Sequence, residues 1–161
     1  MAEKKGRETG RRRTPARVKV YRGGCHCGEV RFEVAAELKE VVECNCSICT
    51  KKGFLHLIVG PERFTLLSPR RALKTYRFNT MTAKHYFCRR CGIHSFYIPR
   101  SHPDRIDVNA RCLEGLDPRR LRVRRFNGRE WEKNVGALRR KPAGSTATAL
   151  RGGRRLMVYD G

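Results

Sequence analysis

The stretch ECNCSICTKKG, residues 43–53, places three cysteines close together: Cys44, Cys46 and Cys49. Side chains two apart on an extended strand point to the same face, so Cys44 and Cys46 can bind one metal ion together. A turn through residues 47–48 would bring Cys49 to the same ion. A structural zinc site normally has four protein ligands, whereas a catalytic site has three and keeps one position for water or substrate. Because no fourth ligand follows nearby, the stretch predicts a metal site with an open position.

Two further cysteine pairs flank this stretch. Cys25 and Cys27 lie upstream in GGCHCGEVRFEV, and Cys88 and Cys91 lie downstream in HYFCRRCGIHSFY. Four thiolates from two separated pairs complete a tetrahedron, so these pairs predict a second, structural zinc ion. Metal binding to the folded state offsets the entropy lost in closing the chain between them. A thioredoxin-like redox role for C-x-x-C is a rival, but that motif opens a helix in a βαβ unit, and here strand-like segments flank it.

The length of 161 residues suits one domain with a real core. The first twenty residues contain no apolar run of the signal-peptide type, and no segment approaches the roughly 20 apolar residues that span a bilayer. We therefore expect a soluble protein without a membrane partner, in a reducing compartment that is cytoplasmic or, in a eukaryote, nuclear. Clustered thiols in such a compartment indicate zinc ligands rather than disulfides.

The formal net charge of +22 is concentrated at the two ends of the chain. Residues 1–22 carry nine Lys and Arg against two Glu, and residues 119–161 carry thirteen against three acidic residues. Basic tails attract polyanions through counterion release, without a specific fold. Two interpretations stay open: a solvated extension, or non-specific binding to nucleic acid. The tails offer no aromatic stacking platform, which argues against sequence-specific recognition.

In residues 18–138, segments of alternating apolar and polar residues are bounded by Gly, Pro and Asn, which predicts a series of short strands. The expected strands lie in VKVY, VRFEV, KEVVECNC, FLHLIV, ERFTLLS, LKTYRFN, SFYIP and RIDVNARCLEG. Trp131 is expected to pack back on this domain, and the sequence after Pro142 lacks hydrophobic periodicity. The sequence therefore predicts one mainly β domain, with basic flexible tails over residues 1–17 and 139–161.

Several polar residues near the cysteines have two interpretations each. Lys51 and Lys52 follow Cys49, where their charge would lower thiol pKa values and could hold an anionic substrate, or they could lie on a solvated turn. His56 could face the metal or the solvent. His26 should point away from the neighbouring sulfurs, because side chains alternate along a strand. His85 and His94 could support a metal site or lie on the surface. Cys112 could supply a distant fourth ligand or a reactive group, or it could be a buried, inert cysteine.

Four segments together resemble the glutathione-dependent formaldehyde-activating enzyme family, which includes the domain of centromere protein V: GGCHCGEVRFEV, CNCSICTKKG, FCRRCGIHSFY and FNGREWEK. The resemblance spans residues 21–134, most of the chain. It implies small β-sheets with two zinc sites in an Mss4-like, or β-tent, architecture. In that pattern the structural zinc would be held by Cys25, Cys27, Cys88 and Cys91, and the catalytic zinc by Cys44, Cys46 and Cys49.

The resemblance also implies carbon–sulfur bond chemistry, as in the condensation of formaldehyde with glutathione to S-hydroxymethylglutathione. An open zinc site suits a carbon–sulfur lyase, because zinc can bind a substrate thiol as thiolate or polarise a carbonyl oxygen. The candidates for holding the glutathione carboxylates are Lys51, Lys52, Arg89 and Arg90. The competing hypothesis is a zinc-stabilised accessory module that binds nucleic acid or chromatin. The basic tails and the similarity to centromere protein V both support it.

Overall fold

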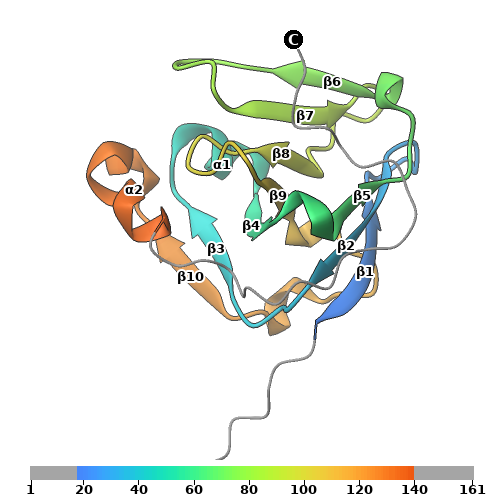
Figure 1. Cartoon of the computed structure of the whole chain (residues 1–161), viewed down its shortest axis with the longest axis horizontal. Helices are drawn as coiled ribbons and strands as arrows, with labels where there is room; N and C mark the ends of the chain where they lie inside the picture. The colour runs from blue at the N-terminus through green and yellow to red at the C-terminus, as the bar shows by residue number, and fades with distance from the viewer. Residues whose placement is uncertain (1–17, 140–161) are drawn as a thin grey trace, which may run out of the picture.

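Two β-sheets pack against each other in the computed structural model, which describes residues 18–139 (Figure 1). The smaller sheet has three antiparallel strands in the order β1-β2-β5. Its strands are β1 (Lys19–Gly24), β2 (Arg31–Ala36) and β5 (Phe64–Leu66). The chain enters this sheet first, and the loop between β1 and β2 carries the first cysteine pair.

The larger sheet has seven strands, and all neighbours in it are antiparallel except the parallel pair β10 and β3. In spatial order the strands are β10 (Val123–Phe126), β3 (Val41–Cys44), β4 (Leu55–Val59), β9 (Ile106–Asn109), β8 (Phe96–Ile98), β7 (Lys84–Cys88) and β6 (Leu73–Tyr76). The β6–β7 hairpin forms one edge of the molecule, and β10 forms the opposite edge of the sheet (Figure 1).

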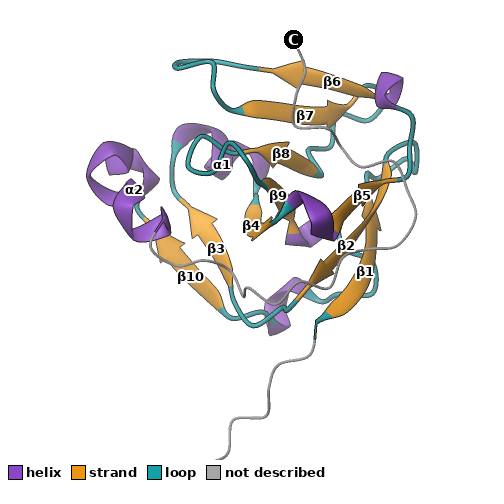
Figure 2. Cartoon of the chain, in the orientation of Figure 1, coloured by secondary structure: helices purple, strands orange, loops and turns teal. Residues whose placement is uncertain are grey.

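Helical structure is confined to connections and to the end of the described chain (Figure 2). The two α-helices are α1 (Ser47–Lys52) and α2 (Trp131–Arg139). Single 3-10 turns are η1 (Pro61–Arg63), η2 (Arg70–Ala72), η3 (Ala110–Cys112), η4 (Pro118–Arg120) and η5 (Gly128–Glu130). None of the helices within residues 18–139 is long and apolar enough to cross a bilayer.

The core lies between the two sheets and is built around three phenylalanines. Phe32 and Phe64 from the small sheet stack at 5.3 Å between ring centroids, and Phe96 from the large sheet lies 4.8 Å from Phe64 and 6.0 Å from Phe32. All three side chains are fully buried. Burying one such side chain contributes about 1.5–3 kcal/mol, so this trio is a main link between the sheets.

Strand alternation places polar residues on the other face of the large sheet. On β4, Leu55, Leu57 and Val59 are buried on the core side, which leaves His56 on the opposite side. The same alternation on β9 turns Ile106 and Val108 inward. The register then aligns residues across that outer face: Val42 opposite His56, Asp107 opposite Tyr97, and Tyr97 opposite His85. This row of side chains borders the candidate site.

The mainly β prediction is confirmed, and all eight expected strands are present, most of them with shorter bounds. The strands β7 and β10 were not expected from the sequence. One local difference concerns the expected turn after Cys46, which continues into the helix α1. Cys46 is its N-cap and Gly53 its left-handed C-cap with φ 58°, where the Gly53 N–H bonds back to the Cys49 and Thr50 carbonyls. The strand expected over residues 105–115 also ends at Asn109. The predictions for residues 1–17 and 140–161 lie outside the described residues.

Candidate metal centre and active site

The first group of thiols, here called the four-thiol cluster, joins the two sheets. Its sulfurs lie within 4.8 Å of one another and belong to Cys25, Cys27, Cys88 and Cys91. The first pair follows β1 of the small sheet, while Cys88 ends β7 of the large sheet. The backbone N–H of Val30 donates to Cys25 Sγ at 3.2 Å, and that of Arg90 donates to Cys88 Sγ at 3.4 Å. Such donors favour the thiolate form that binds metal.

The second group, here called the three-thiol cluster, lies where β3 passes into α1. Cys44, Cys46 and Cys49 bring their sulfurs within 4.8 Å of one another. Hydrogen bonds from the Cys44 and Cys49 thiols, together with the backbone N–H groups of Ile48 and Cys49, lower the pKa of the Cys46 thiol to about 2. The same thiol contacts raise the pKa values of Cys44 and Cys49. These contacts therefore favour ionisation of Cys46 at the N-terminal turn of α1.

The three-thiol cluster has no fourth protein ligand in the part of the chain that the structure describes. Neither a histidine nitrogen nor a carboxylate oxygen of residues 18–139 joins the three sulfurs within the same 4.8 Å. The four-thiol cluster, by contrast, already offers a full tetrahedral set. The seven sulfurs are thus grouped as the spacing predicts, in two clusters that could each hold a metal ion.

The segment after β10 covers the three-thiol cluster from one side. Asn45 makes one hydrogen bond to the end of β10 and two to this segment: its N–H donates to the Phe126 carbonyl at 3.3 Å, its side-chain amide donates to Asn127 Oδ1 at 3.1 Å, and its Oδ1 accepts from the Arg129 N–H at 3.1 Å. Gly128 lies so close that a Cβ there would collide with Cys44 Sγ. A glycine at position 128 is therefore required by the approach of this segment to the sulfurs.

A cavity of about 910 Å³ opens onto the three-thiol cluster. Its wall includes the ring of Trp131 and five arginines, Arg63, Arg100, Arg105, Arg124 and Arg129. Arg100 lies over that ring at 3.3 Å from its centroid and bonds to Glu132 at 2.7 Å, while Arg124 bonds to Glu40 at 3.0 Å. No ion pair forms at Arg105 or Arg129 within residues 18–139. The cavity is therefore large enough for a small molecule and carries cationic groups on its wall.

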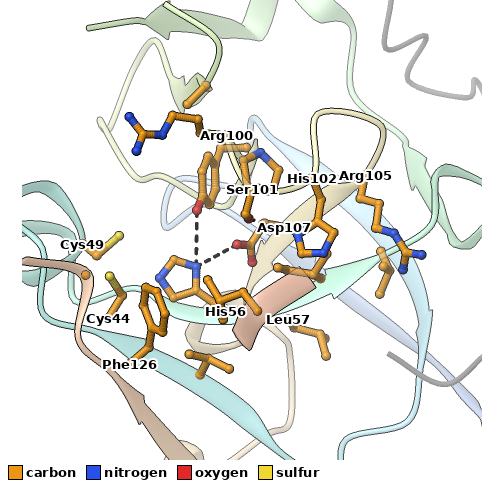
Figure 3. A pocket seen from close by; sticks show the side chains of 18 of the residues that line it. Cys44, Cys49, His56, Leu57, Arg100, Ser101, His102, Arg105, Asp107 and Phe126 are labelled. Atoms are coloured by element: carbon orange, nitrogen blue, oxygen red, sulfur yellow. Dashed lines mark hydrogen bonds and ion pairs between the residues drawn. The ribbon is translucent and has the colours of Figure 1, made fainter. Parts of the chain in front are cut away.

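A histidine and an aspartate lie on the cavity wall next to the three-thiol cluster (Figure 3). His56 Nδ1 is 2.7 Å from Asp107 Oδ2, and the Tyr97 hydroxyl is 3.5 Å from the same nitrogen. Burial and the nearby Asp107 raise the pKa of Tyr97 well above its usual value, so this phenol stays neutral. The second ring nitrogen of His56, Nε2, is buried and has no hydrogen-bond partner.

The sequence profile of the glutathione-dependent formaldehyde-activating enzyme family matches residues 20–127. The chain belongs to this family. The resemblance of its four sequence segments is thus confirmed. A crystal structure of a Rhodobacter sphaeroides protein superposes on this chain with a TM-score of 0.59; the two are 34% identical over 64% of this chain and 99% of that one.

The lysines predicted to hold substrate line a different cavity from the three-thiol cluster. Lys51 and Lys52 line a second cavity of about 970 Å³, which His26, His94 and Cys112 also line. Lys52 Nζ bonds to His85 Nδ1 at 2.9 Å, and desolvation lowers the Lys52 pKa to about 8. Desolvation and the Lys52 charge lower the pKa of His85 to about 3, so this ring is neutral.

The other candidates are placed in different surroundings. Arg89 and Arg90 are exposed beside the four-thiol cluster and line neither of the two cavities. Cys112 is half-buried outside both clusters, and burial raises the pKa of its thiol. His85 stacks on Tyr97 at 4.8 Å between centroids, and both rings line the larger cavity.

Several residues of the site carry no obvious motif and were missed by sequence reasoning: Asn45, Tyr97, Asp107 and Gly128. One signal was available for Asp107. It stands between Ile106 and Val108 in an apolar strand, as His56 stands between Leu55 and Leu57, and a polar residue within such a strand must face a polar site or solvent. Asn45 and Gly128 depend on a contact between β3 and β10 that strand patterns do not reveal.

Proposed function

We propose that this protein is a zinc-dependent carbon–sulfur lyase that acts on thiol–aldehyde adducts of the S-hydroxymethylglutathione type. The observation that carries the proposal is the three-thiol cluster, which has no fourth ligand within residues 18–139 and faces a cavity of about 910 Å³. A binding module gains little from an incompletely coordinated ion, whereas a lyase needs a free position for its substrate. Membership of the family supports glutathione as the thiol.

The residues present suit zinc at both clusters. Sets of cysteine thiolates select zinc over hard cations such as magnesium, and the backbone N–H groups donating to sulfur stabilise the thiolate form. The structural ion would be held by Cys25, Cys27, Cys88 and Cys91, and the catalytic ion by Cys44, Cys46 and Cys49. Zinc bound by the three-thiol cluster supplies Lewis acidity toward a sulfur or a carbonyl oxygen.

Two arginines are well placed to hold the carboxylates of a glutathione adduct. Arg105 and Arg129 line the same cavity as the three-thiol cluster, and neither forms an ion pair within residues 18–139. A guanidinium matches a carboxylate with two parallel hydrogen bonds. Lys51 and Lys52 line the other cavity, and the Lys52 amine is engaged by His85 at 2.9 Å. Arg105 and Arg129 therefore fit an adduct in the larger space beside the sulfurs.

Exchange spectroscopy by NMR tests this function, because the adduct forms and breaks without a catalyst at a rate that serves as reference. We expect the protein to accelerate exchange between glutathione and its formaldehyde adduct. Cys46→Ser should remove the acceleration while the domain stays folded, and Cys112→Ser, which changes a thiol outside both clusters, should keep it. An exchange rate equal to that of buffer alone would rule out the lyase.

The competing hypothesis of nucleic-acid binding depends on the basic ends of the chain, which lie outside the described residues. It remains a prediction, separate from the lyase, and the same protein could have both properties. For the location of the protein we propose a reducing compartment, because all eight cysteines are free in the structure and seven of them lie in the two clusters.

A further inference from the structure

The imidazole of His56 is buried but has one unused nitrogen. The residue is 8% exposed and Asp107 beside it is 1% exposed, yet His56 Nε2 and Asp107 Oδ1 have no hydrogen-bond partner. Buried polar atoms are nearly always satisfied in folded proteins, so an orphaned pair needs an explanation. If the His56–Asp107 pair served only to link β4 to β9, hydrogen bonds to His56 Nε2 and Asp107 Oδ1 would stabilise the fold further. An interaction of Nε2 with a molecule bound in the cavity explains the missing partner instead.

The position of His56 on the sheet directs this nitrogen toward the three-thiol cluster. Val42 lies opposite His56, and Cys44 is two residues further along β3 on the same face. Figure 3 shows the ring between Asp107 on one side and the sulfurs of Cys44 and Cys49 on the other, with Nε2 on the side of the sulfurs. Since His56 is not within the 4.8 Å grouping, it lies beside the cluster without being a member of it.

The contact with Asp107 fixes which nitrogen carries the proton. A carboxylate can only accept hydrogen bonds, so the 2.7 Å contact assigns a proton to Nδ1, and in the neutral form of the ring the lone pair then lies on Nε2. The ring is held further by Phe54, whose centroid is 4.8 Å away. A neutral imidazole held in one tautomer, with its lone pair directed at the site, has the form of a general base.

We propose that His56 is the catalytic acid–base residue of the lyase reaction, with Asp107 as its positioning residue; this inference rests on the proposed function. In adduct formation, His56 Nε2 takes the proton from the substrate thiol. The sulfur forms a bond to the carbonyl carbon, the π electrons of C=O move to oxygen, and that oxygen takes the proton from Nε2. In cleavage the hydroxyl proton moves to Nε2, the C–S bond breaks, and the sulfur regains the proton.

Other basic groups around the cavity fit this role less well. His85 Nδ1 is engaged by Lys52 at 2.9 Å, and the charge of that lysine opposes protonation of the ring. His102 Nδ1 is bonded to Ser101 Oγ at 3.0 Å, on the loop between β8 and β9. Of these three histidines, only His56 combines a carboxylate on one nitrogen with a buried, unpartnered second nitrogen facing the cluster.

Nitrogen-15 NMR of the imidazole tests the tautomer without any measurement of activity. In the zinc-loaded wild-type protein we expect a neutral His56 with the proton on Nδ1 and a bare Nε2. Asp107→Asn should shift the population toward the other tautomer, because an amide can donate to Nδ1. A proton found on Nε2 of the wild-type ring in the absence of substrate would overturn the proposal, whatever the variants do.

Exchange NMR with His56→Gln tests the role itself. We expect the catalysed exchange to fall at least about 100-fold, the usual contribution of a general acid–base, while zinc content and glutathione affinity stay unchanged. His102→Gln, a histidine of the same cavity, should keep the wild-type rate. Wild-type exchange in His56→Gln would refute the assignment, and loss of one zinc ion would make His56 a ligand instead. Absence of catalysis in the wild-type protein would instead overturn the lyase function, and this role with it.

Discussion

The two cysteine clusters use the same side chain in different surroundings. The four-thiol cluster joins the loop after β1 to the end of β7, so it ties the small sheet to the large one. The three-thiol cluster lies within one short segment of the large sheet, at a cavity and next to a buried histidine. The number of thiols and the elements that carry them therefore distinguish the two sites. The four-thiol cluster stabilises the fold, whereas the three-thiol cluster is placed for catalysis.

The largest difference between the clusters should appear in stability. Cys88→Ser removes one ligand of the four-thiol cluster, and a structural zinc ion contributes on the order of 10 kcal/mol of folding free energy. We expect this variant to be unfolded or only partly folded at 25 °C by circular dichroism. Cys46→Ser should fold with nearly wild-type thermal stability. Equal destabilisation by the two substitutions would contradict the division of roles.

Gly128→Ala should remove zinc from the three-thiol cluster and leave the four-thiol cluster loaded. The added Cβ would collide with Cys44 Sγ and would lie 3.0 Å from Cys46 Cβ, so the three-thiol cluster must open or the covering segment must move. We expect one zinc ion instead of two by elemental analysis, with the fold retained. Gly136→Ala, on the exposed face of α2, is the matched control and should keep both ions. Two tightly bound ions in Gly128→Ala would show that the close approach is unimportant.

Asn45→Ala should destabilise the three-thiol cluster and its covering segment, with a smaller effect than Gly128→Ala. The substitution removes two side-chain hydrogen bonds to Asn127 and Arg129, each worth about 0.5–1.5 kcal/mol. We expect a loss of about 1–3 kcal/mol in the free energy of unfolding, and faster release of zinc from the three-thiol cluster to a chelator. Release of both ions at the same increased rate would indicate that the clusters are coupled.

The smallest effect on either cluster is expected from removing the ends of the chain. Deletion of residues 1–17 and 140–161 takes away twelve Lys and Arg. If these residues bind nucleic acid, the affinity for a DNA duplex, measured by fluorescence anisotropy, should be salt-dependent in the full chain and lost after deletion. Zinc content and adduct exchange should not change. Unaltered DNA affinity would place the binding within residues 18–139.

The partition of the thiols could be predicted from the sequence because metal ligands follow short, rigid spacings. The C-x-C and C-x-x-C pairs restrict which sulfurs can meet before any tertiary structure is known. Eight of the ten strands within residues 18–139 could be predicted for a similar reason, since apolar alternation is a local property, whereas β7 and β10 were missed. The short helix α1 was missed because residues 47–52 are too few for a helical period, and its N-cap is a cysteine rather than Ser, Thr, Asp or Asn.

The rest of the site could not be predicted because it depends on strand register. His56 meets Asp107 across the pairing of β4 with β9, and a shift of one residue would turn Asp107 into the core. Gly128 meets Cys44 because β10 pairs with β3 in parallel, after a chain separation of more than 80 residues. Most arginines of the cavity wall likewise lie far from the cysteines of the three-thiol cluster in the sequence, for example on β10, in η5 and on the loop between β8 and β9.

The most direct test of the central claim is X-ray absorption at the zinc edge of the two-zinc protein. Clusters of four and three thiols predict an average of about 3.5 sulfurs per zinc, with an oxygen or nitrogen ligand making up the difference. Addition of glutathione should raise the average toward about 4, because its sulfur enters the open position. An average of about 4 sulfurs before glutathione is added, or no change after it, would contradict an open catalytic site at Cys44, Cys46 and Cys49.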